Sequence, residues 1–545
     1  HFNLLSEVVA ETSGFESLAT LIGGDSQSER WFSSSLGGGH AGWPDMGTMM
    51  KVVLVLIAAE CAGGLQSCVR RRPFVTMSAT TTTAVTKAQS MLADFERKPR
   101  RIPLTTTPTT ATTPSRHRIA VFLLNLGGPE TSEDVEPFLY NLFADPDIIR
   151  LPAAVGGAQT ALAWLIAKRR APRSRAAYDT IGGGSPITRF TKAQAQLLED
   201  ALNTEAAKKQ LQPSGAFDFR CYVAMRYWRP FTDEALERAS ADGCASAIVL
   251  PLYPHFSIST TGSSLRALLA EMQASHPRLF ASHTVVPSWH RSRGYVDVVA
   301  RLVAGEVRNL PPPTKTTTTT TRKAKAAKSE EEEEPPPVVL FSAHGVPVSY
   351  IEEQGDPYKS HVEETVDLVS KRVRGLLAGS RRVDFELAFQ SRVGPVEWLR
   401  PYTDDALMDM AKRGVKGVVV VPISFVSEHI ETLEEIDVEY KEIAEDAGIR
   451  HWRRVPALNL EPDFIQELKH QVVDALYNRP AVSTSEACVV NAFDLDDQPL
   501  GVLTGVDRDV ELINTRTAAV AIAITALFEL LANSRAIHLF GLGAV

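Results

Sequence analysis

The chain repeats an eight-residue stretch, Arg229-Pro-Phe-Thr-Asp-Glu-Ala-Leu236, as Arg400-Pro-Tyr-Thr-Asp-Asp-Ala-Leu407. The same offset, without a gap, pairs Gly243 with Gly414 a few residues further on. Apolar residues at helical spacing followed by a glycine indicate an amphipathic helix and its cap. Each copy therefore predicts a turn, a helix, a glycine cap and then a new element.

That new element is an apolar strand in both copies, Ala247–Leu250 and Val418–Val421. Each half also opens with a short apolar strand, which begins at Ile119 in the first half and at Val338 in the second. Apolar strands that alternate with helices indicate parallel sheets covered by helices on both faces. We therefore predict an α/β fold of two similar domains, with ligands bound outside the carboxyl ends of the strands.

A tract rich in Pro, Thr, Lys and Glu divides the globular part of the chain. Such a composition buries too little apolar surface to fold, so the tract is predicted to be a low-complexity, disordered insertion. The predicted order is an N-terminal region (1–115), a first domain (116–310), the insertion (311–337), a second domain (338–475), a linker (476–510) and a tail (511–545).

Composition excludes several classes of protein. The formal net charge of the 545 residues is −8, and five of the negative charges lie in the run Glu330–Glu334, so the folded part is only mildly acidic. Nothing in the sequence forms a basic nucleic-acid surface, and no nucleic-acid partner is expected. The five cysteines include no C-x-x-C pair, which argues against a disulfide framework and against a structural zinc site.

The N-terminal region has the composition of sorting signals. A start near Met49 would place Lys51 before the short apolar run Val52–Ala59, which is the layout of a secretory signal. The stretch Arg70–Arg118 is rich in Ser, Thr and Arg and poor in acids, as transit peptides are. A signal followed by a transit peptide predicts import into a plastid through the secretory route; the alternative is a merely disordered N-terminus.

Polar residues follow the predicted strands, and two groups are informative: His344-Gly345 and Ser427-Glu-His-Ile-Glu431. Imidazole is a good ligand for Fe(II) and exchanges protons near neutrality, and carboxylates supply oxygen ligands and accept protons. A helix after the last strand would place four glutamates on one face. They are Glu428, Glu431, Glu435 and Glu439. The alternatives are a solvated acidic helix and a histidine satisfied within the core.

Six motifs resemble, in this order, those of ferrochelatases, and together they cover roughly residues 119–475. The motifs are Leu124-Asn-Leu-Gly-Gly-Pro-Glu130, Tyr178-Asp-Thr-Ile-Gly-Gly-Gly-Ser-Pro-Ile187, Tyr253-Pro-His-Phe-Ser-Ile-Ser-Thr-Thr-Gly-Ser-Ser264, Phe341-Ser-Ala-His-Gly345, Phe389-Gln-Ser-Arg-Val-Gly-Pro395 and Ser427-Glu-His-Ile-Glu-Thr-Leu433. The resemblance implies two Rossmann-like domains that clasp a porphyrin. It also implies insertion of Fe(II) into protoporphyrin IX, with release of two protons, as the terminal step of haem biosynthesis.

Roles for individual residues follow from the same resemblance. His344 and Glu431 would be the catalytic pair that handles the metal and accepts protons, supported by His429 and Glu435 as a conduit. The residues implied in holding the propionates are Arg170, Tyr178, Ser185 and Ser391. Those implied in lining the porphyrin pocket are Arg226, Tyr227, Tyr253 and Trp398.

The resemblance also bears on cofactors. Animal ferrochelatases carry a [2Fe–2S] cluster on one cysteine of the S-T-T-G-S-S motif and three near the C-terminus. Here that motif begins Ile258-Ser-Thr260, and Cys488 is alone in the C-terminal region. Because a cluster needs about four such ligands, we expect no iron–sulfur cluster and no tightly bound cofactor, with Fe(II) as a substrate.

The tail contains an apolar stretch, Thr517–Ala532, which is short for a membrane span; a buried soluble helix is the alternative. Just before it, Glu511, Asn514 and Arg516 resemble the E-x-x-N-x-R signature of chlorophyll a/b-binding and light-harvesting-like proteins. The resemblance implies one C-terminal helix in the thylakoid or envelope membrane. It further implies chlorophyll on Asn514, and pairing of Glu511 and Arg516 with another copy of the chain or a light-harvesting-like partner.

Two other functions stay open at the level of sequence. A coproporphyrin or sirohydrochlorin chelatase would share the fold and the metal chemistry but act on a more carboxylated tetrapyrrole. A pigment-binding sensor would keep the chelatase domains only as an inactive scaffold, against which the intact His344 and Glu431 argue.

Overall fold

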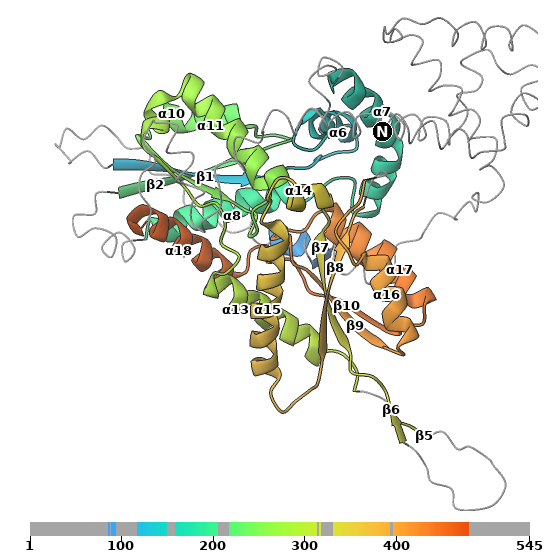
Figure 1. Cartoon of the computed structure of the whole chain (residues 1–545). Helices are drawn as coiled ribbons and strands as arrows, with labels where there is room; N and C mark the ends of the chain where they lie inside the picture. The colour runs from blue at the N-terminus through green and yellow to red at the C-terminus, as the bar shows by residue number, and fades with distance from the viewer. Residues whose placement is uncertain are drawn as a thin grey trace, which may run out of the picture. The chain divides into compact units, whose positions relative to one another are not determined.

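The computed structural model describes residues 86–87, 89–93, 117–149, 159–204, 217–312, 315–317, 331–392 and 396–478 (Figure 1). Most of the predicted targeting region lies outside these residues, as do the linker after residue 478 and the tail with Glu511, Asn514 and Arg516. Leu92, from the region predicted to be targeting or disordered sequence, is buried against Phe190 and Ala193 of the first domain. Packing on this domain therefore includes part of the chain before residue 116.

The first sheet is parallel, with four strands in the order β2-β1-β3-β4. The strands are β1 (His117–Asn125), β2 (Phe217–Met225), β3 (Ser246–Pro251) and β4 (His283–Val285). The helices of this half are α6 (Val135–Ala144), α7 (Gln159–Thr180), α8 (Ile187–Leu202), α10 (Thr232–Ala241), the π-helix η2 (Ile258–Gly262), α11 (Ser263–Ser275), α12 (Pro277–Ala281) and α13 (Arg293–Arg308).

The second sheet has the same design, with four parallel strands in the order β8-β7-β9-β10. The strands are β7 (Val338–His344), β8 (Asp384–Gln390), β9 (Gly417–Pro422) and β10 (His451–Arg454). The helices are α14 (Val348–Glu352), α15 (Tyr358–Leu377), α16 (Thr403–Lys412), the π-helix η3 (Glu431–Tyr440), α17 (Lys441–Asp446) and α18 (Pro462–Asn478). The prediction of two similar α/β domains with parallel sheets is confirmed.

The repeated octapeptide forms the predicted elements in both domains. It opens α10 in the first and α16 in the second, and each helix is followed by a glycine in the left-handed region, Gly243 (φ 74°) and Gly414 (φ 82°). Left-handed backbone after a helix favours glycine, which has no Cβ to strain there. The strands β3 and β9 begin three residues after these glycines, as the repeat predicts.

The two sheets share one apolar core. Along β1, Ile119, Val121 and Leu123 point into this shared core, whereas the alternate residues face a second cluster with α10 and α11. Val339 and Phe341 of β7 enter the shared core from the other sheet. Burying apolar surface stabilises the folded state by about 25 cal/mol per Å², so this shared core holds the two halves together.

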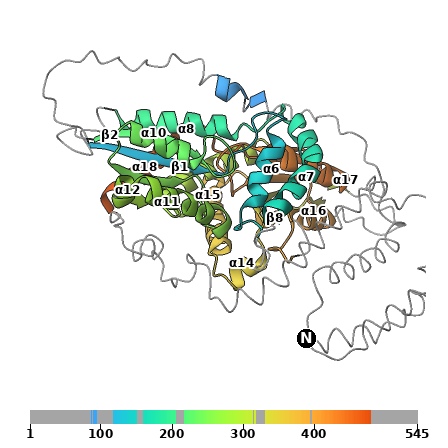
Figure 2. The same cartoon turned by 90° about the horizontal axis from the view of Figure 1, so that it is seen from above.

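Helices are exchanged across the predicted domain boundary. α13, which precedes the insertion in sequence, packs against α15 and β9 of the second half, and α18, near the end of the second half, packs against α8, β3 and β4 of the first. The views in Figures 1 and 2 both place α18 beside α8. Each half therefore completes its layers with a helix from the other.

The insertion differs in part from the prediction of disorder. Its two ends form an antiparallel ribbon of β5 (Lys315–Thr317) and β6 (Glu331–Glu333), and residues 318–330 between them lie outside the described residues. The threonines at the start of the ribbon belong to a residue type that favours strands, a signal that the overall polarity of the tract obscured. Within the described ranges, no helix is long and apolar enough to cross a membrane.

Candidate active site

The candidate site lies at the carboxyl ends of β7 and β9. The chain leaves β7 for β8 on one side and later returns to β9 on the other, so the crevice between β7 and β9 is a topological switch point, the usual ligand site of such sheets. His344 ends β7, and its backbone N donates to the hydroxyl of Ser424, 3.1 Å away, just after β9. The sheet itself thus brings His344 to the crevice.

His344 is paired with Glu431. Its Nδ1 lies 2.8 Å from Glu431 Oε2, and the two side chains retain 38% and 22% of their exposure. Burial opposes a charge on His344, but the carboxylate of Glu431 and the hydrogen bond to it outweigh burial and raise the pKa of His344. Burial likewise opposes the charge on Glu431, but His344 lowers its pKa. The pair forms a charge-assisted hydrogen bond. This bond uses Nδ1 of His344 and does not use the other ring nitrogen, Nε2.

Neighbouring groups fix the backbone of His344. The hydroxyl of Tyr358 donates to the His344 carbonyl at 2.9 Å and is 2.7 Å from the hydroxyl of Ser424. A Cβ added at Gly345 would lie 2.8 Å from the Gln390 carbonyl oxygen and 3.2 Å from the ring of Trp398. Glycine is therefore required for β7 to approach β8 this closely, and Trp398 is held beside the site.

Glu435 forms the second carboxylate of the cluster. The hydroxyl of Ser391 donates to its two oxygens at 2.8 and 2.9 Å, and the hydroxyl of Tyr440 donates at 2.9 Å. The amide of Gln390 donates both to Glu435 (3.4 Å) and to Glu431 (3.3 Å). Burial and the nearby charge of Glu431 raise the pKa of Glu435. Two carboxylates with opposite pKa shifts share one proton-exchanging cluster.

The predicted glutamate stripe is wrong in part. Glu431 and Glu435 do face the cluster, but Glu428 is buried against Arg454 and Glu439 is exposed. Glu428 lies before η3, which begins at Glu431, and so is not on the helix at all. Within η3 the backbone bonds join residues five apart, so the α-helical spacing assumed for Glu439 does not apply. Only two of the four glutamates reach the candidate site.

His429 lies directly behind the pair. Its Nε2 is 3.9 Å from Glu431 Oε1, and its Nδ1 is 3.1 Å from the Ser427 carbonyl. The ring of Phe425 packs against it at 4.2 Å between ring centres. Burial lowers the pKa of His429 despite the nearby Glu431. The structure therefore places His429 next to Glu431.

The paired helices α6 and α7 reach the second domain, and α7 contacts η3 (Figure 2). Tyr178 of α7 is buried in one apolar cluster with Tyr227 and with Leu433 of η3. Burial and then the charge of Glu431 raise the pKa of Tyr178, which places this tyrosine within electrostatic reach of the site. The structure thus brings Tyr178 to the site from the other domain.

Two further predicted residues lie around α7. The guanidinium of Arg170 lies over the ring of Phe143, 5.6 Å from its centre. Ser185, which follows α7, donates its backbone N–H to the Pro129 carbonyl at 2.7 Å, and its side chain lies against Gly128. Arg170 thus lies within α7, and Ser185 lies between α7 and α8.

Arg226 and Tyr227 belong to a second polar cluster. The buried carboxylate of Asp145 accepts from the Tyr227 hydroxyl (2.8 Å), from the Ser263 hydroxyl (2.5 Å) and from Arg226 (2.9 Å). Tyr227 is 0% exposed, so its ring is not on the surface of a cleft as predicted for a pocket-lining residue. Tyr253, predicted with them, is buried and lies 3.3 Å from the Ser264 hydroxyl.

Sequence reasoning missed several of these partners. Gln390 could have been found, because it is the last residue of β8 and lies next to His344. Ligands of such sheets bind at the carboxyl ends of the strands. Tyr440 and Asp145 carried no such signal, since each contributes through a contact that only the folded chain creates. Tyr440 reaches back along η3 to Glu435, and Asp145 lies 82 residues before Tyr227.

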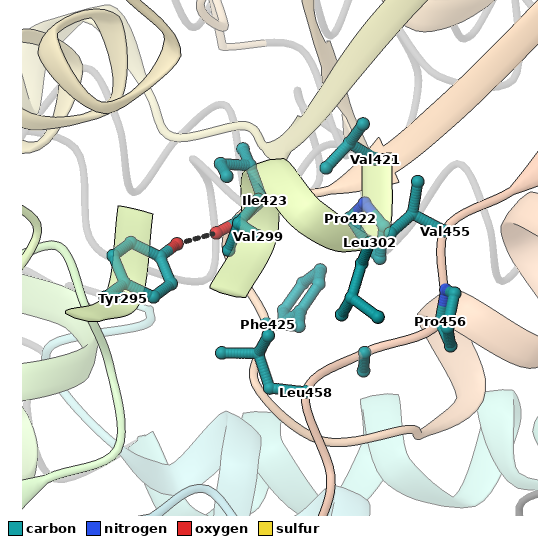
Figure 3. Close-up of a pocket in the computed structure, with 11 residues that line it drawn as sticks. Tyr295, Val299, Leu302, Val421, Pro422, Ile423, Phe425, Val455, Pro456 and Leu458 are labelled. Carbon is teal, nitrogen blue, oxygen red and sulfur yellow. Dashed lines mark hydrogen bonds between the residues drawn. The ribbon is translucent and has the colours of Figure 1, made fainter. Parts of the chain in front are cut away.

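A different, apolar pocket lies behind Phe425 (Figure 3). It is partly open to solvent, and its walls come from α13, the end of β9 and the segment after β10. Tyr295, Val299, Ile423, Phe425, Val455 and Leu458 are among its lining residues. Because these side chains carry no metal ligand, the pocket does not compete with the His344 crevice as a metal-handling site.

The cluster has few ligands for a resident metal. In the part of the chain that the structure describes, no three His, Cys, Asp or Glu side chains gather as a metal cage. Resident zinc and other transition metals take four or more ligands, three or four of them from protein.

Comparisons with known proteins agree with this chemistry. The family model described as Ferrochelatase matches residues 118–476. Ferrochelatase-2, chloroplastic, of Oryza sativa subsp. indica is 44% identical over 445 residues, which cover 78% of each chain. Ferrochelatase-2, chloroplastic, of Arabidopsis thaliana is 47% identical over 374 residues, 68% of this chain and 66% of the relative. The Ferrochelatase of a Nostoc species is 45% identical over 426 residues, 78% of this chain and 99% of the relative.

Proposed function

This chain belongs to the ferrochelatase family, and from that premise we propose that it inserts Fe(II) into protoporphyrin IX to form haem, the terminal step of haem synthesis. The observation that carries the proposal is the 2.8 Å pair of His344 and Glu431 in the crevice between β7 and β9. The family membership makes the chain a metal chelatase, a lyase, with a porphyrin and ferrous iron as its substrates.

The chemistry requires two protons to leave the substrate. Metallation replaces two pyrrole N–H bonds with Fe–N bonds, so the porphyrin loses two protons while iron stays Fe(II). His344 accepts a proton through its imidazole, and the carboxylate of Glu431 stabilises the imidazolium that results. In its neutral form His344 offers a nitrogen ligand, and Glu431 an oxygen ligand, to Fe(II) as it loses its waters; an imidazolium has no lone pair, so metal binding and proton uptake by His344 are alternative states.

Glu435 and His429 support the removal of the protons. Glu435, whose pKa burial and Glu431 raise, lies beyond Glu431 and shares the Gln390 amide with it. A carboxyl group with a raised pKa exchanges protons near neutral pH, which suits a relay between Glu431 and solvent. His429, with its Nε2 3.9 Å from Glu431 Oε1, is proposed to support that carboxylate electrostatically and not through a hydrogen bond.

The porphyrin is proposed to lie between η3 and the α6–α7 pair. Tyr178 and Trp398 supply apolar walls near Glu431 and Gly345. Arg170, Tyr178, Ser185 and Ser391 are proposed to hold the propionates, since hydroxyls and a guanidinium suit carboxylates. Arg226, Tyr227 and Tyr253 are proposed to shape the pocket from behind, through the Asp145 cluster.

We propose that the enzyme works without an iron–sulfur cluster. Cys221 and Cys244 are free, and burial raises the pKa of each thiol. Thiolates are the form that ligates iron, so neither residue favours a cluster. Cys488 lies outside the described residues.

We further propose a plastid location, in keeping with relatives that are named chloroplastic. The segment with Glu511, Asn514 and Arg516 is proposed to anchor the enzyme in the thylakoid or envelope membrane, where Asn514 binds chlorophyll and a second copy or a light-harvesting-like protein is the partner. In this proposal the signal and transit segments before residue 116 direct import.

Truncation after Gln498 tests the anchor. The shortened enzyme should move from the membrane pellet to the supernatant after carbonate extraction and should still insert iron, because the described domains end at residue 478. A truncated protein that stays in the pellet, or a full-length protein that is already extracted, contradicts the anchor.

The activity itself is tested with purified full-length enzyme and Fe(II) under anaerobic conditions. Protoporphyrin IX, coproporphyrin and sirohydrochlorin are offered separately, and the appearance of the metallated product is followed by absorbance. Protoporphyrin IX should give the highest kcat/KM. A higher value for either of the more carboxylated tetrapyrroles would assign the chain to that substrate instead.

A further inference from the structure

A buried arginine contacts the π-helix η3. Arg454 is the last residue of β10, and its side chain is 5% exposed. Its Nη1 lies 3.0 Å from Glu428 Oε1 and its Nε lies 2.9 Å from Asp437 Oδ2. The two carboxylates are 3% and 1% exposed. Charges buried this deeply persist only when they are paired.

The two carboxylates bracket the catalytic segment. Glu428 precedes Glu431 by three residues, and Asp437 follows Glu435 by two. One guanidinium therefore ties together both ends of the stretch that carries the glutamates of the site. The rigid planar fork of arginine can bridge two carboxylates in this way, whereas a single ammonium is a point charge.

The π-helix η3 needs contacts from outside to be stable. π-helices occur mostly as single turns within α-helices, but η3 runs for ten residues. Local backbone preference does not sustain that length, so contacts from outside must. Glu428 accepts from the Thr432 hydroxyl at 2.5 Å and from the backbone N of Ala457 at 3.1 Å, in addition to Arg454.

The hydrogen bonds around Glu428 extend to the first domain. The backbone N of Glu428 donates to the side-chain oxygen of Asn459 at 2.9 Å. The amide of Gln194, on α8, donates to the Asn459 carbonyl at 2.8 Å and to the Ser427 hydroxyl at 3.0 Å. The start of the catalytic segment is thus held between β10 and the other half of the molecule.

We propose that Arg454 is a positioning residue for the reaction: by bridging Glu428 and Asp437 it holds η3 so that Glu431 and Glu435 face His344. This rests on the role of Glu431 proposed above. Glu428, although adjacent in sequence to His429, is in this view part of the brace and not a proton acceptor. Both of its oxygens already accept hydrogen bonds, from Arg454 and Ala457 at Oε1 and from Thr432 at Oε2.

The test is Arg454→Met, which keeps most of the volume and removes the charge. Glu428 then loses the guanidinium that pairs with it, and Asp437 keeps only the charge of Lys441, so we expect η3 to shift. We expect kcat per porphyrin-binding site to fall at least tenfold, with the KM for protoporphyrin IX within about twofold of wild type. Arg454→Lys, which keeps the charge but not the fork, should recover part of kcat.

Arg453→Met is the matched control, because Arg453 is the neighbouring residue of β10 and pairs instead with Glu306 of α13. It should keep the wild-type kcat per binding site even where it lowers the melting temperature. Counting sites by porphyrin binding removes the contribution of unfolded molecules, so a merely structural role of Arg454 would leave kcat per site unchanged. That result would overturn the proposal.

Glu431→Gln is assayed in parallel to separate the two proposals. If Glu431→Gln keeps full activity, the proposed catalytic pair is wrong. If Glu431→Gln loses activity while Arg454→Met keeps the wild-type kcat per site, only the positioning role is wrong. Should Arg454→Met yield no folded protein, Arg454→Lys decides by the same measurement, and a wild-type kcat per site in that variant would also count against the brace.

Discussion

At the scale of single residues, the site depends on how two similar carboxylates are made different. His344 lowers the pKa of Glu431 against the effect of burial, whereas burial and the charge of Glu431 raise the pKa of Glu435 despite the hydrogen bonds from Ser391 and Tyr440. The strand ends pointed to the segments that contain His344 and Glu431, and the family resemblance implied these two residues as the pair. Their partners Tyr440 and Arg454 were not, because these contacts form only in the folded chain.

Glu431→Gln tests the first carboxylate. Glutamine keeps the shape and can still hydrogen-bond to His344, but it cannot stabilise the imidazolium. We expect kcat to fall by about 10²-fold or more, the usual range for loss of a general acid–base partner, with porphyrin binding unchanged in a fluorescence titration. Glu439→Gln, at an exposed position of the same helix, is the control and should retain wild-type kcat. Equal activities of the two variants would count against the pair.

At the scale of elements, the repeat explains both what the sequence revealed and what it concealed. Apolar runs and glycine caps identified α10, α16, β3 and β9 because those features are local. In both halves the third strand is followed by a π-helix, η2 or η3, which no local pattern indicated. Glu428 lies before η3 begins, and η3 has π-helical and not α-helical spacing, so the spacing rules for an α-helix misplaced both Glu428 and Glu439.

Gly345→Ala tests the close approach of β7 and β8. The added methyl would lie 2.8 Å from the Gln390 carbonyl oxygen, so the strand end carrying His344 must move. We expect a loss of about 1–3 kcal/mol in the free energy of unfolding together with a lower kcat. Gly375→Ala, within α15 and with nothing near its Cβ, should instead be neutral or stabilising. A Gly345→Ala enzyme with wild-type kcat would show that the approach does not position His344.

At the scale of the whole molecule, the halves are joined by the exchanged helices and by buried histidines between them. His255, after β3, bonds to Thr365 of α15, and the ring of His361 on α15 stacks on that of His290 at 3.8 Å. The exchange was not predictable, because the low-complexity tract marks a boundary in composition and not in packing. The family motifs predicted which residues meet at the catalytic pair, but not how the halves interlock.

The histidines between the halves, His255, His290 and His361, form a seam that makes the free energy of unfolding depend on pH. Burial, then His290 and Arg291, lower the pKa of His361 to about 3, and burial lowers that of His255 as well; Glu364 opposes the shift of His361. Between that pH and about 6.5 the unfolded chain binds more protons, so stability falls as pH drops below 6.5. Asp356 at the same seam, its pKa raised by burial to about 6, offsets part of this loss between pH 6 and 3.8.

Urea unfolding at pH 7 and pH 5 measures this effect. His361→Phe keeps an aromatic ring against His290 but cannot bind a proton, so it should remove on the order of 2 kcal/mol of the loss between the two pH values. His470→Phe, at an exposed position on α18, is the control and should leave the loss unchanged. An identical loss in wild type and His361→Phe would contradict the assignment to the seam.

The central claim is that iron insertion requires His344, which is paired with Glu431 near the carboxyl ends of β7 and β9. The most direct measurement is anaerobic Fe(II) insertion into protoporphyrin IX by full-length His344→Ala, with melting temperature and porphyrin affinity measured on the same preparation and with exposed His470→Ala as control. We predict that His344→Ala binds porphyrin and stays folded but forms no haem above the uncatalysed rate, whereas His470→Ala behaves as wild type. Near-normal turnover by folded His344→Ala would contradict the claim.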